Sequence, residues 1–144
     1  MIYRFIRSFI RNNHLGYKTL FIAIDIHETV LKPTWSKEII KCIFYPFAKK
    51  VLQMMSNDPK FILILWTSCY QFDIDNYKSF FKQNNIIFNY VNSNPEVKNT
   101  DYANFDSKFF IDLGFDDKFG FNPYIDWFGI YCILQIRKLW NILF

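Results

Sequence analysis

Residues able to carry out phosphoryl-transfer chemistry stand at the ends of three apolar segments of this 144-residue chain. Asp25 ends the segment 19–25, Thr67 and Ser68 follow 61–66, and Asp116 and Asp117 follow 109–115, which Lys108 precedes. Together they offer a nucleophile or metal ligand, hydroxyl donors, a carboxylate pair and a cation. In an open parallel sheet, ligands bind beyond the carboxyl ends of the strands, so these residues would share one site.

The pattern around these segments predicts strands that alternate with helices. Apolar spacing favours helices over residues 2–11, from Pro46 to 57, from 73 to 83 and from 124 onward. Near-continuous apolar runs favour buried strands at 19–25, 61–66, 86–91 and 109–115. This order predicts an α/β fold, a three-layer Rossmann-like parallel sheet flanked by helices. We expect residues 1–18 to form a basic amphipathic arm and residues 19–144 a single domain.

The ordered motifs resemble those of the haloacid dehalogenase-like (HAD) phosphohydrolases. That family carries D-x-D-x-T-[LV] after a hydrophobic strand, and this chain reads DIHETV at 25–30. A second family strand ends in Thr or Ser, as ILILWT does at 62–67. A Lys then precedes a strand that ends in two acids, as Lys108 precedes FDD at 115–117. The resemblance covers roughly residues 19–135 and implies a HAD-like fold.

The resemblance implies a Mg²⁺-dependent phosphatase in which Asp25 forms an aspartyl-phosphate. Three groups would hold the Mg²⁺, namely the Asp25 carboxylate, the backbone carbonyl of His27 and the Asp116 carboxylate. Asp117 would belong to the same metal site by positioning one of the bound waters.

Phosphate would be bound by the hydroxyls and the cation of the set. Thr67 and Ser68 would donate hydrogen bonds to it. Lys108 would neutralise Asp25 and the transferring oxygens, a role suited to a site that gathers negative charge. The resemblance thus makes Asp25, His27, Thr67 and Lys108 the catalytic residues.

One position departs from the family pattern. Family phosphatases usually have a second Asp two residues after the nucleophile, which protonates the leaving group and then activates water, and this chain has His27. An imidazole can serve as both acid and base. Three interpretations remain open: a working phosphatase with a His acid/base, a slow phosphatase, or a catalytically silent module that binds a partner through its apolar terminal helices.

The spacing of the motifs leaves no room for a cap domain. The intervals from Asp25 to Thr67 and from Thr67 to Lys108 each fit one helix with connecting chain. Capless members of the family act mostly on large phosphorylated substrates, although some take small molecules. The stretch 108–118 also looks like that of deoxyribonucleotidases, which favours a nucleotide or a polynucleotide end. Several aromatic residues near the expected loops could stack on a base, namely Trp35, Trp66, Tyr70, Tyr102 and Phe105.

The net charge of +4 lies in the N-terminal segment. Residues 1–24 contain Arg4, Arg7, Arg11 and Lys18 and no acidic residue, whereas the rest of the chain has equal numbers of basic and acidic residues. A neutral body argues against strong general nucleic-acid binding. The amphipathic segment itself predicts a helix docked on the domain, or else peripheral membrane contact or organelle targeting through residues 1–12.

Composition and cysteine usage narrow the class of protein. The chain is 51% hydrophobic and 21% charged, which excludes a disordered chain. Its 22% aromatic content is typical of an AT-rich genome, such as that of a bacterium, a phage or another virus. Three Cys without metal-ligand spacing predict a reducing compartment, the cytoplasm of the cell or of an infected host. No apolar stretch is long enough for a transmembrane helix. The apolar residues 127–144 would pack on the N-terminal helix, form a homodimer or partner seam, or lie on a membrane.

Overall fold

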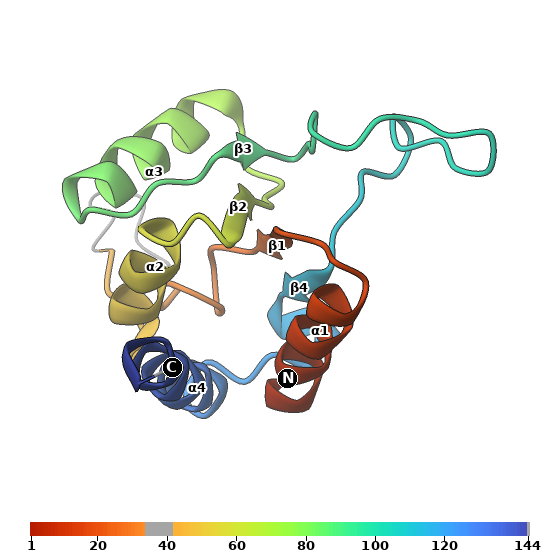
Figure 1. Ribbon diagram of the computed structural model, residues 1–144. Coiled ribbons are helices and arrows are strands. Elements are labelled where there is room, and N and C mark those ends of the chain that lie inside the picture. Colours follow the sequence, from red (N-terminus) through yellow and green to blue (C-terminus); the bar gives the residue numbers. More distant parts are fainter. Residues whose placement is uncertain (34–41, 144) are drawn as a thin grey trace.

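A parallel four-stranded sheet lies at the centre of the computed structural model, which describes residues 1–33 and 42–143 (Figure 1). The strands are β1 (Leu20–Ile24), β2 (Phe61–Leu65), β3 (Tyr90–Val91) and β4 (Leu113–Phe115), in the order β3-β2-β1-β4. All five residues of β1 pair with β2, and residues 22–24 also pair with β4. The predicted α/β fold with a parallel sheet is confirmed.

In the described part of the chain, four α-helices flank this sheet. They are α1 (Ile2–His14), α2 (Ala48–Ser56), α3 (Gln71–Gln83) and α4 (Asp126–Leu143), and a short 3-10 helix, η1 (Asp117–Phe119), follows β4. In Figure 1, α2 and α4 lie below the sheet, α1 beside β4, and α3 beside β3. Apolar side chains of β1 and β2 are buried against Phe5 of α1, Leu52 of α2 and Trp127 of α4. This layer arrangement is that of Rossmann-like folds.

The basic N-terminal segment is a helix packed on the sheet and on α4. Phe5 of α1 is fully buried, whereas Arg4 and Arg7 are exposed. The buried Asn12 side chain donates a hydrogen bond to the carbonyl of Thr19 (3.1 Å), which ties the end of α1 to the start of β1. The amphipathic pattern of this segment therefore buries one face and leaves Arg4 and Arg7 in water, while Arg11 pairs with the carboxylate of Asp112.

Two predicted strands are shorter than expected because side chains replace backbone groups in their pairing. Of the strand predicted at 86–91, only Tyr90–Val91 is a strand, since the Asn89 side chain accepts the hydrogen bond of Leu63 N–H (2.9 Å). Of the strand predicted at 109–115, only Leu113–Phe115 is one. There the Asp112 carboxylate accepts from Phe21 N–H (2.9 Å). In both places, regular backbone pairing begins with the residue that follows the Asn or Asp.

The helix predicted to begin at Pro46 begins at Ala48 instead. Phe47 adopts a left-handed conformation (φ 65°), which no α-helix accommodates, so Pro46 lies outside the helix. The Phe47 ring packs on Phe128 and Tyr131 of α4, with centroids 5.1 and 5.2 Å apart. Packing between helices thus decides where α2 starts.

The apolar C-terminal helix is only partly covered. Trp127, Ile130 and Leu134 of α4 are buried, while Ile136 and Leu139 remain exposed. Gly129 lets α1 approach closely, because a Cβ at that position would lie 2.2 Å from Cδ1 of Ile2. Within the described residues, no helix is both long and apolar enough to cross a membrane.

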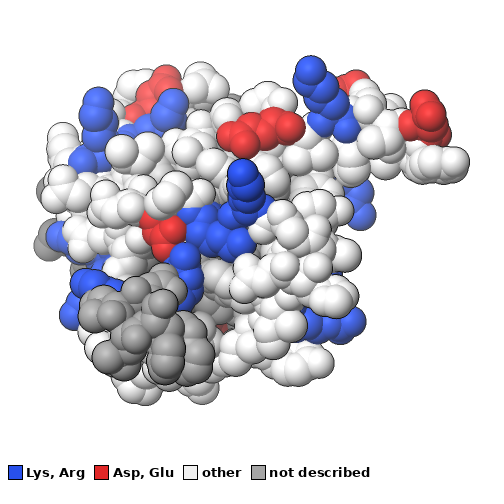
Figure 2. Space-filling view, in the orientation of Figure 1, with Lys and Arg blue, Asp and Glu red and all other residues white. Residues whose placement is uncertain are grey.

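The segment between β3 and β4 projects away from the body of the molecule (Figure 1). Tyr102, within this projecting loop, is 99% exposed. Charges of both signs are interspersed on the face seen in Figure 2, and most of that surface is uncharged. In the described parts of the two intervals between motifs, the structure has α2 and β2 in the first and α3, β3 and the projecting loop in the second, without a cap domain.

Candidate functional site

Three strand ends bring the predicted residues to one edge of the sheet. The backbone N–H of Asp25, just after β1, donates to the carbonyl of Phe115 at the end of β4 (2.9 Å). The N–H of Trp66, just after β2, donates to the carbonyl of Ile24 (2.9 Å). Asp25 therefore lies between the end of β2, which leads to Thr67, and the end of β4, which leads to Asp116 and Asp117. This is the edge at which parallel sheets bind ligands.

The Asp25 carboxyl group is strongly perturbed by this position. Burial raises its pKa, a hydrogen bond from the backbone N–H of Ile26 lowers it, and the charges of Asp116 and Asp117 raise it further, so that the pKa lies at about 6. The cation that opposes these effects is Lys118. Perturbation of this kind is common at functional sites.

A tight loop after β1 connects Asp25 to the carboxylate pair. The N–H groups of Val30 and Leu31 both donate to the carbonyl of Ile26 (2.9 and 2.8 Å), and Glu28 has a left-handed φ of 55°. Thr29, at the apex, is fully buried. Its hydroxyl accepts from the N–H of Asp117 (3.1 Å), and its carbonyl accepts from the Trp127 indole (2.8 Å). The Thr of the DIHETV motif is therefore a positioning residue for the acids after β4.

The carboxylates after β4 are held by η1 and by a lysine that the sequence analysis did not select. The Asp116 carboxylate caps η1 by accepting from the N–H of Lys118 (2.7 Å). The Lys118 ammonium pairs with Asp117 and lies 3.6 Å from Glu28. The positive charge of Lys118 thus partly offsets the negative charge of the carboxylates at the site. Lys108, the predicted cation, is exposed, makes no salt bridge among the described residues, and its role stays a prediction.

Thr67 is held in place by Asn92, another residue that the sequence analysis missed. The Asn92 side chain accepts from Thr67 N–H (2.9 Å) and donates to the Thr67 carbonyl (2.6 Å). The Thr67 hydroxyl accepts from Cys69 N–H (3.2 Å) and keeps its own proton for donation. Ser68 is exposed beside it. Both hydroxyls thus follow β2 at the same edge as Asp25.

His27 turns toward α3. Its Nε2 lies 2.7 Å from the Tyr77 hydroxyl, and the two rings meet edge to face with centroids 5.5 Å apart. Burial raises the pKa of Tyr77 to about 12, so its hydroxyl is neutral and can donate to the imidazole. No sequence pattern indicates this contact, because it depends on how α3 packs over the loop.

The oxygen donors of the site suit a hard cation. Asp25 and Asp116 provide two carboxylates, and the carbonyl of His27 lies two residues from Asp25. Burial is the largest cause of the raised pKa of Asp25, and the negative charges of Asp116 and Asp117 add to it; a divalent cation would relieve the repulsion among these carboxylates. No group of three or more His, Cys, Asp or Glu side chains arranged to hold a metal occurs in the described part of the chain. A metal here would accordingly have two carboxylates, a carbonyl and waters as ligands.

Comparison with solved structures finds the same fold in a conserved protein from Bacteroides thetaiotaomicron. The TM-score is 0.62 at 22% sequence identity, and the match covers 83% of this chain and 92% of that one. At this identity, the likeness establishes the fold alone. No protein-family model and no curated protein matches the chain.

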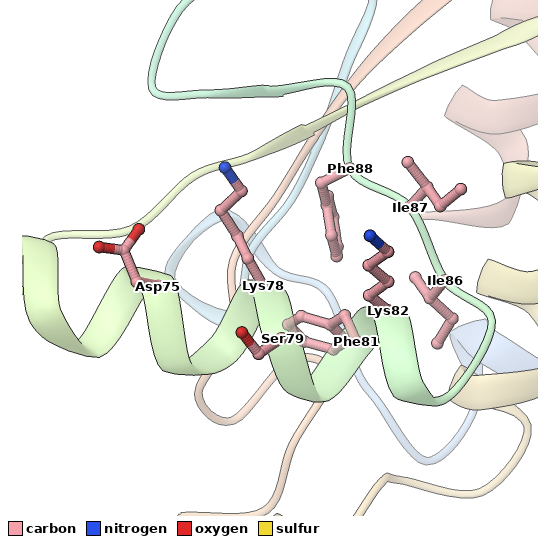
Figure 3. Close-up of a pocket in the computed structure, with 8 residues that line it drawn as sticks. All are labelled: Asp75, Lys78, Ser79, Phe81, Lys82, Ile86, Ile87 and Phe88. Atoms are coloured by element: carbon pink, nitrogen blue, oxygen red, sulfur yellow. The ribbon is translucent and has the colours of Figure 1, made fainter.

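Several cavities in the described part of the chain lie apart from the candidate site. The one in Figure 3, about 450 Å³, lies between α3 and residues 86–88, with Lys78 and Lys82 projecting from α3. A second, about 730 Å³, lies near the start of β1, and Lys18, Phe21 and Phe105 are among its lining residues. The predicted catalytic residues line neither cavity.

The aromatic residues singled out from the sequence are not gathered in one place. Trp35 lies outside the described residues, and Tyr70 and Tyr102 are exposed. Phe105 packs on Phe110, with centroids 5.8 Å apart. Trp66 alone of the described members directly precedes a predicted site residue, Thr67.

Proposed function

We propose that the chain is a capless HAD-like, Mg²⁺-dependent phosphomonoester hydrolase with Asp25 as its nucleophile. The observation that carries the proposal is the convergence of Asp25 with Asp116 and Asp117, whose charges help to raise the pKa of Asp25. The order of the sequence motifs supports the same function. At neutral pH, above a pKa of about 6, most of Asp25 is the carboxylate that a nucleophile must be.

The reaction would proceed in two displacements at phosphorus. An Asp25 oxygen forms a bond to phosphorus as the ester P–O bond breaks, and the alcohol leaves with a proton from the His27 imidazole. Water then attacks the phosphorus of the aspartyl-phosphate, gives its proton to His27, and Asp25 leaves as a carboxylate. The products are an alcohol and inorganic phosphate, and the enzyme returns to its starting state.

The other residues would bind and orient. Thr67 donates its hydroxyl proton to a phosphoryl oxygen, and Lys118 or Lys108 offsets negative charge. Asp25, Asp116 and the carbonyl of His27 would hold the Mg²⁺. When bound, this ion neutralises charge on the transferring phosphoryl group. Thr29 keeps Asp117 in place through its buried hydroxyl.

One observation favours a second candidate, a phosphate-binding module without turnover. The Nε2 of His27 is engaged by Tyr77 at 2.7 Å, so the imidazole that would protonate the leaving group has a competing partner. Such a module would still bind Mg²⁺ and phosphate through Asp25, Asp116 and Thr67.

Hydrolysis of an aryl phosphate, followed with Mg²⁺ and with EDTA, tests the proposal. We expect the parent to hydrolyse the ester only with Mg²⁺. Asp25→Asn should lower this activity at least a thousandfold, whereas Asp101→Asn should be as active as the parent. The Asp101→Asn control makes the same change at an exposed carboxylate of the projecting loop. Asp25→Asn as active as the parent would refute the nucleophile. Mg²⁺-dependent binding of beryllium fluoride without turnover would favour the phosphate-binding module.

A further inference from the structure

Aromatic rings form a cluster beside the candidate site. Trp66, directly after β2, meets Phe119 of η1 and Phe109, with ring centroids 5.9 and 5.8 Å away. We call these three residues the aromatic platform. Trp66 precedes Thr67, and Phe119 follows Asp117 by two residues, so two of the rings are placed by the same strand ends as the catalytic groups.

The platform lies on the sheet face from which Asp25 emerges. Side chains alternate along a strand, so Ala23 and Asp25 share one face, opposite the buried Ile22 and Ile24. On β4, a Cβ at Gly114 would lie 3.9 Å from the Phe119 ring, which puts that ring on the Ala23 side. Since β1 lies between β2 and β4, Trp66 and Phe119 meet across β1.

The small residues beneath the rings set the spacing to the nucleophile. Ala23 and Gly114 are paired neighbours on β1 and β4, and neither has a side chain long enough to separate the rings from the sheet. Asp25 lies two residues beyond Ala23, about 7 Å along the strand direction. A phosphate at Asp25 and a flat ring on the platform are therefore one short linker apart.

The platform is open to solvent at one ring. Phe119 is 55% exposed, so part of its ring is accessible to a ligand. An exposed aromatic face next to a phosphate site offers stacking to any planar ring that the phosphate carries.

We infer that the aromatic platform binds the planar ring of the substrate, and that the substrate is a nucleoside monophosphate. This inference rests on the proposed function and adds the substrate class. A single nucleotide fits better than a long polynucleotide, because residues 25–144 have as many acidic as basic residues and offer no surplus cations for further phosphates.

The test compares two substrates that differ only in the base. Adenosine 5′-monophosphate and ribose 5-phosphate are assayed with the parent, Phe119→Ala and Phe128→Ala. The last variant removes a ring of similar exposure (51%) from α4. Stacking by one ring corresponds to about a five- to 150-fold effect. We expect kcat/KM to favour the nucleotide in the parent, and Phe119→Ala to lose five- to 150-fold on the nucleotide and less than twofold on ribose 5-phosphate.

Other outcomes separate this inference from the proposed function. Equal losses on both substrates, or a parent that does not distinguish them, would overturn the inference, because the ring would then only support the loop of Asp116. If neither substrate turns over, equilibrium dialysis with Mg²⁺ decides. Nucleotide binding that is lost in Phe119→Ala and retained in Phe128→Ala supports the platform, while the hydrolase proposal fails. If the parent binds no nucleotide, the platform inference is overturned.

Discussion

At the scale of single residues, Asp25 is a group that the fold holds at a cost to stability. Its pKa rises from 3.8 to about 6, with burial as the largest cause and the charges of Asp116 and Asp117 adding to it. The protonated form is therefore favoured in the folded protein. The contribution of protonated Asp25 to the free energy of unfolding is fully present below the pKa of the unfolded chain, 3.8. It is lost as the pH rises through the folded-state pKa of about 6.

Asp25→Asn should therefore stabilise the metal-free protein at neutral pH. Because the carboxylate is partly solvated, we expect a gain of about 1–2 kcal/mol rather than the full value of the pKa shift. Urea unfolding in EDTA at pH 7.5 measures the gain, which should vanish at pH 4. Asp101→Asn should change stability little at either pH. A neutral-pH loss of stability in Asp25→Asn would contradict the electrostatic picture.

Thr29→Val removes a hydroxyl at nearly constant volume. The N–H of Asp117 then loses its acceptor, for an expected cost of about 1–2 kcal/mol. Weaker Mg²⁺ binding should accompany it, because Asp117 is no longer fixed. Chemical unfolding and calorimetric Mg²⁺ titration provide the two readings. Thr100→Val is the control: its hydroxyl also accepts a backbone N–H, that of Tyr102, but at an exposed position where water can replace it. Unchanged Mg²⁺ affinity in Thr29→Val would refute the positioning role.

At the scale of elements, the contact of α1 with α4 depends on the absence of a side chain at Gly129. Alanine is favoured over glycine in a helix by about 1 kcal/mol, yet a Cβ here would lie 2.7 Å from Cγ1 of Ile2. In an Ile2→Ala background, Gly129→Ala should raise the free energy of unfolding. In the parent, the effect of Gly129→Ala on the free energy of unfolding should be less favourable than this by about 1 kcal/mol or more. Thermal unfolding of the four proteins of this double-mutant cycle gives the coupling. Additive effects would mean that the helices separate freely.

How far each element follows from the sequence depends on which partner fixes it. Apolar runs placed β1 and β2 within one residue, since buried strands need only their own composition. The shortened β3 and β4 did not follow, because Asn89 and Asp112 act through atoms of other strands. The ordered motifs likewise indicated Asp25, Thr67 and Asp116. Tyr77, Asn92 and Lys118 had no pattern of their own, as each matters through a contact made only after folding.

At the scale of the whole molecule, the projecting loop between β3 and β4 should be the first place that a protease cuts. Tyr102 is 99% exposed and stands apart from the sheet in Figure 1. Brief chymotrypsin treatment under native conditions should nick the chain after Tyr102, as intact-mass analysis would detect. Phe105→Ala should leave this cut unchanged, whereas Tyr102→Gly should slow it markedly. A first cut within β1 or α4 would be inconsistent with the fold.

The position of this loop has a consequence for how the molecule could be assembled from parts. A break at residue 102 would leave Asp25 and Thr67 on one fragment and Asp116 and Asp117 on the other. Pairing of β1 with β4, and packing of α4 on α1 and α2, would still join the two. Co-expressed as separate polypeptides, residues 1–102 and 103–144 should therefore associate by complementation, and neither half alone would hold a complete set of site residues.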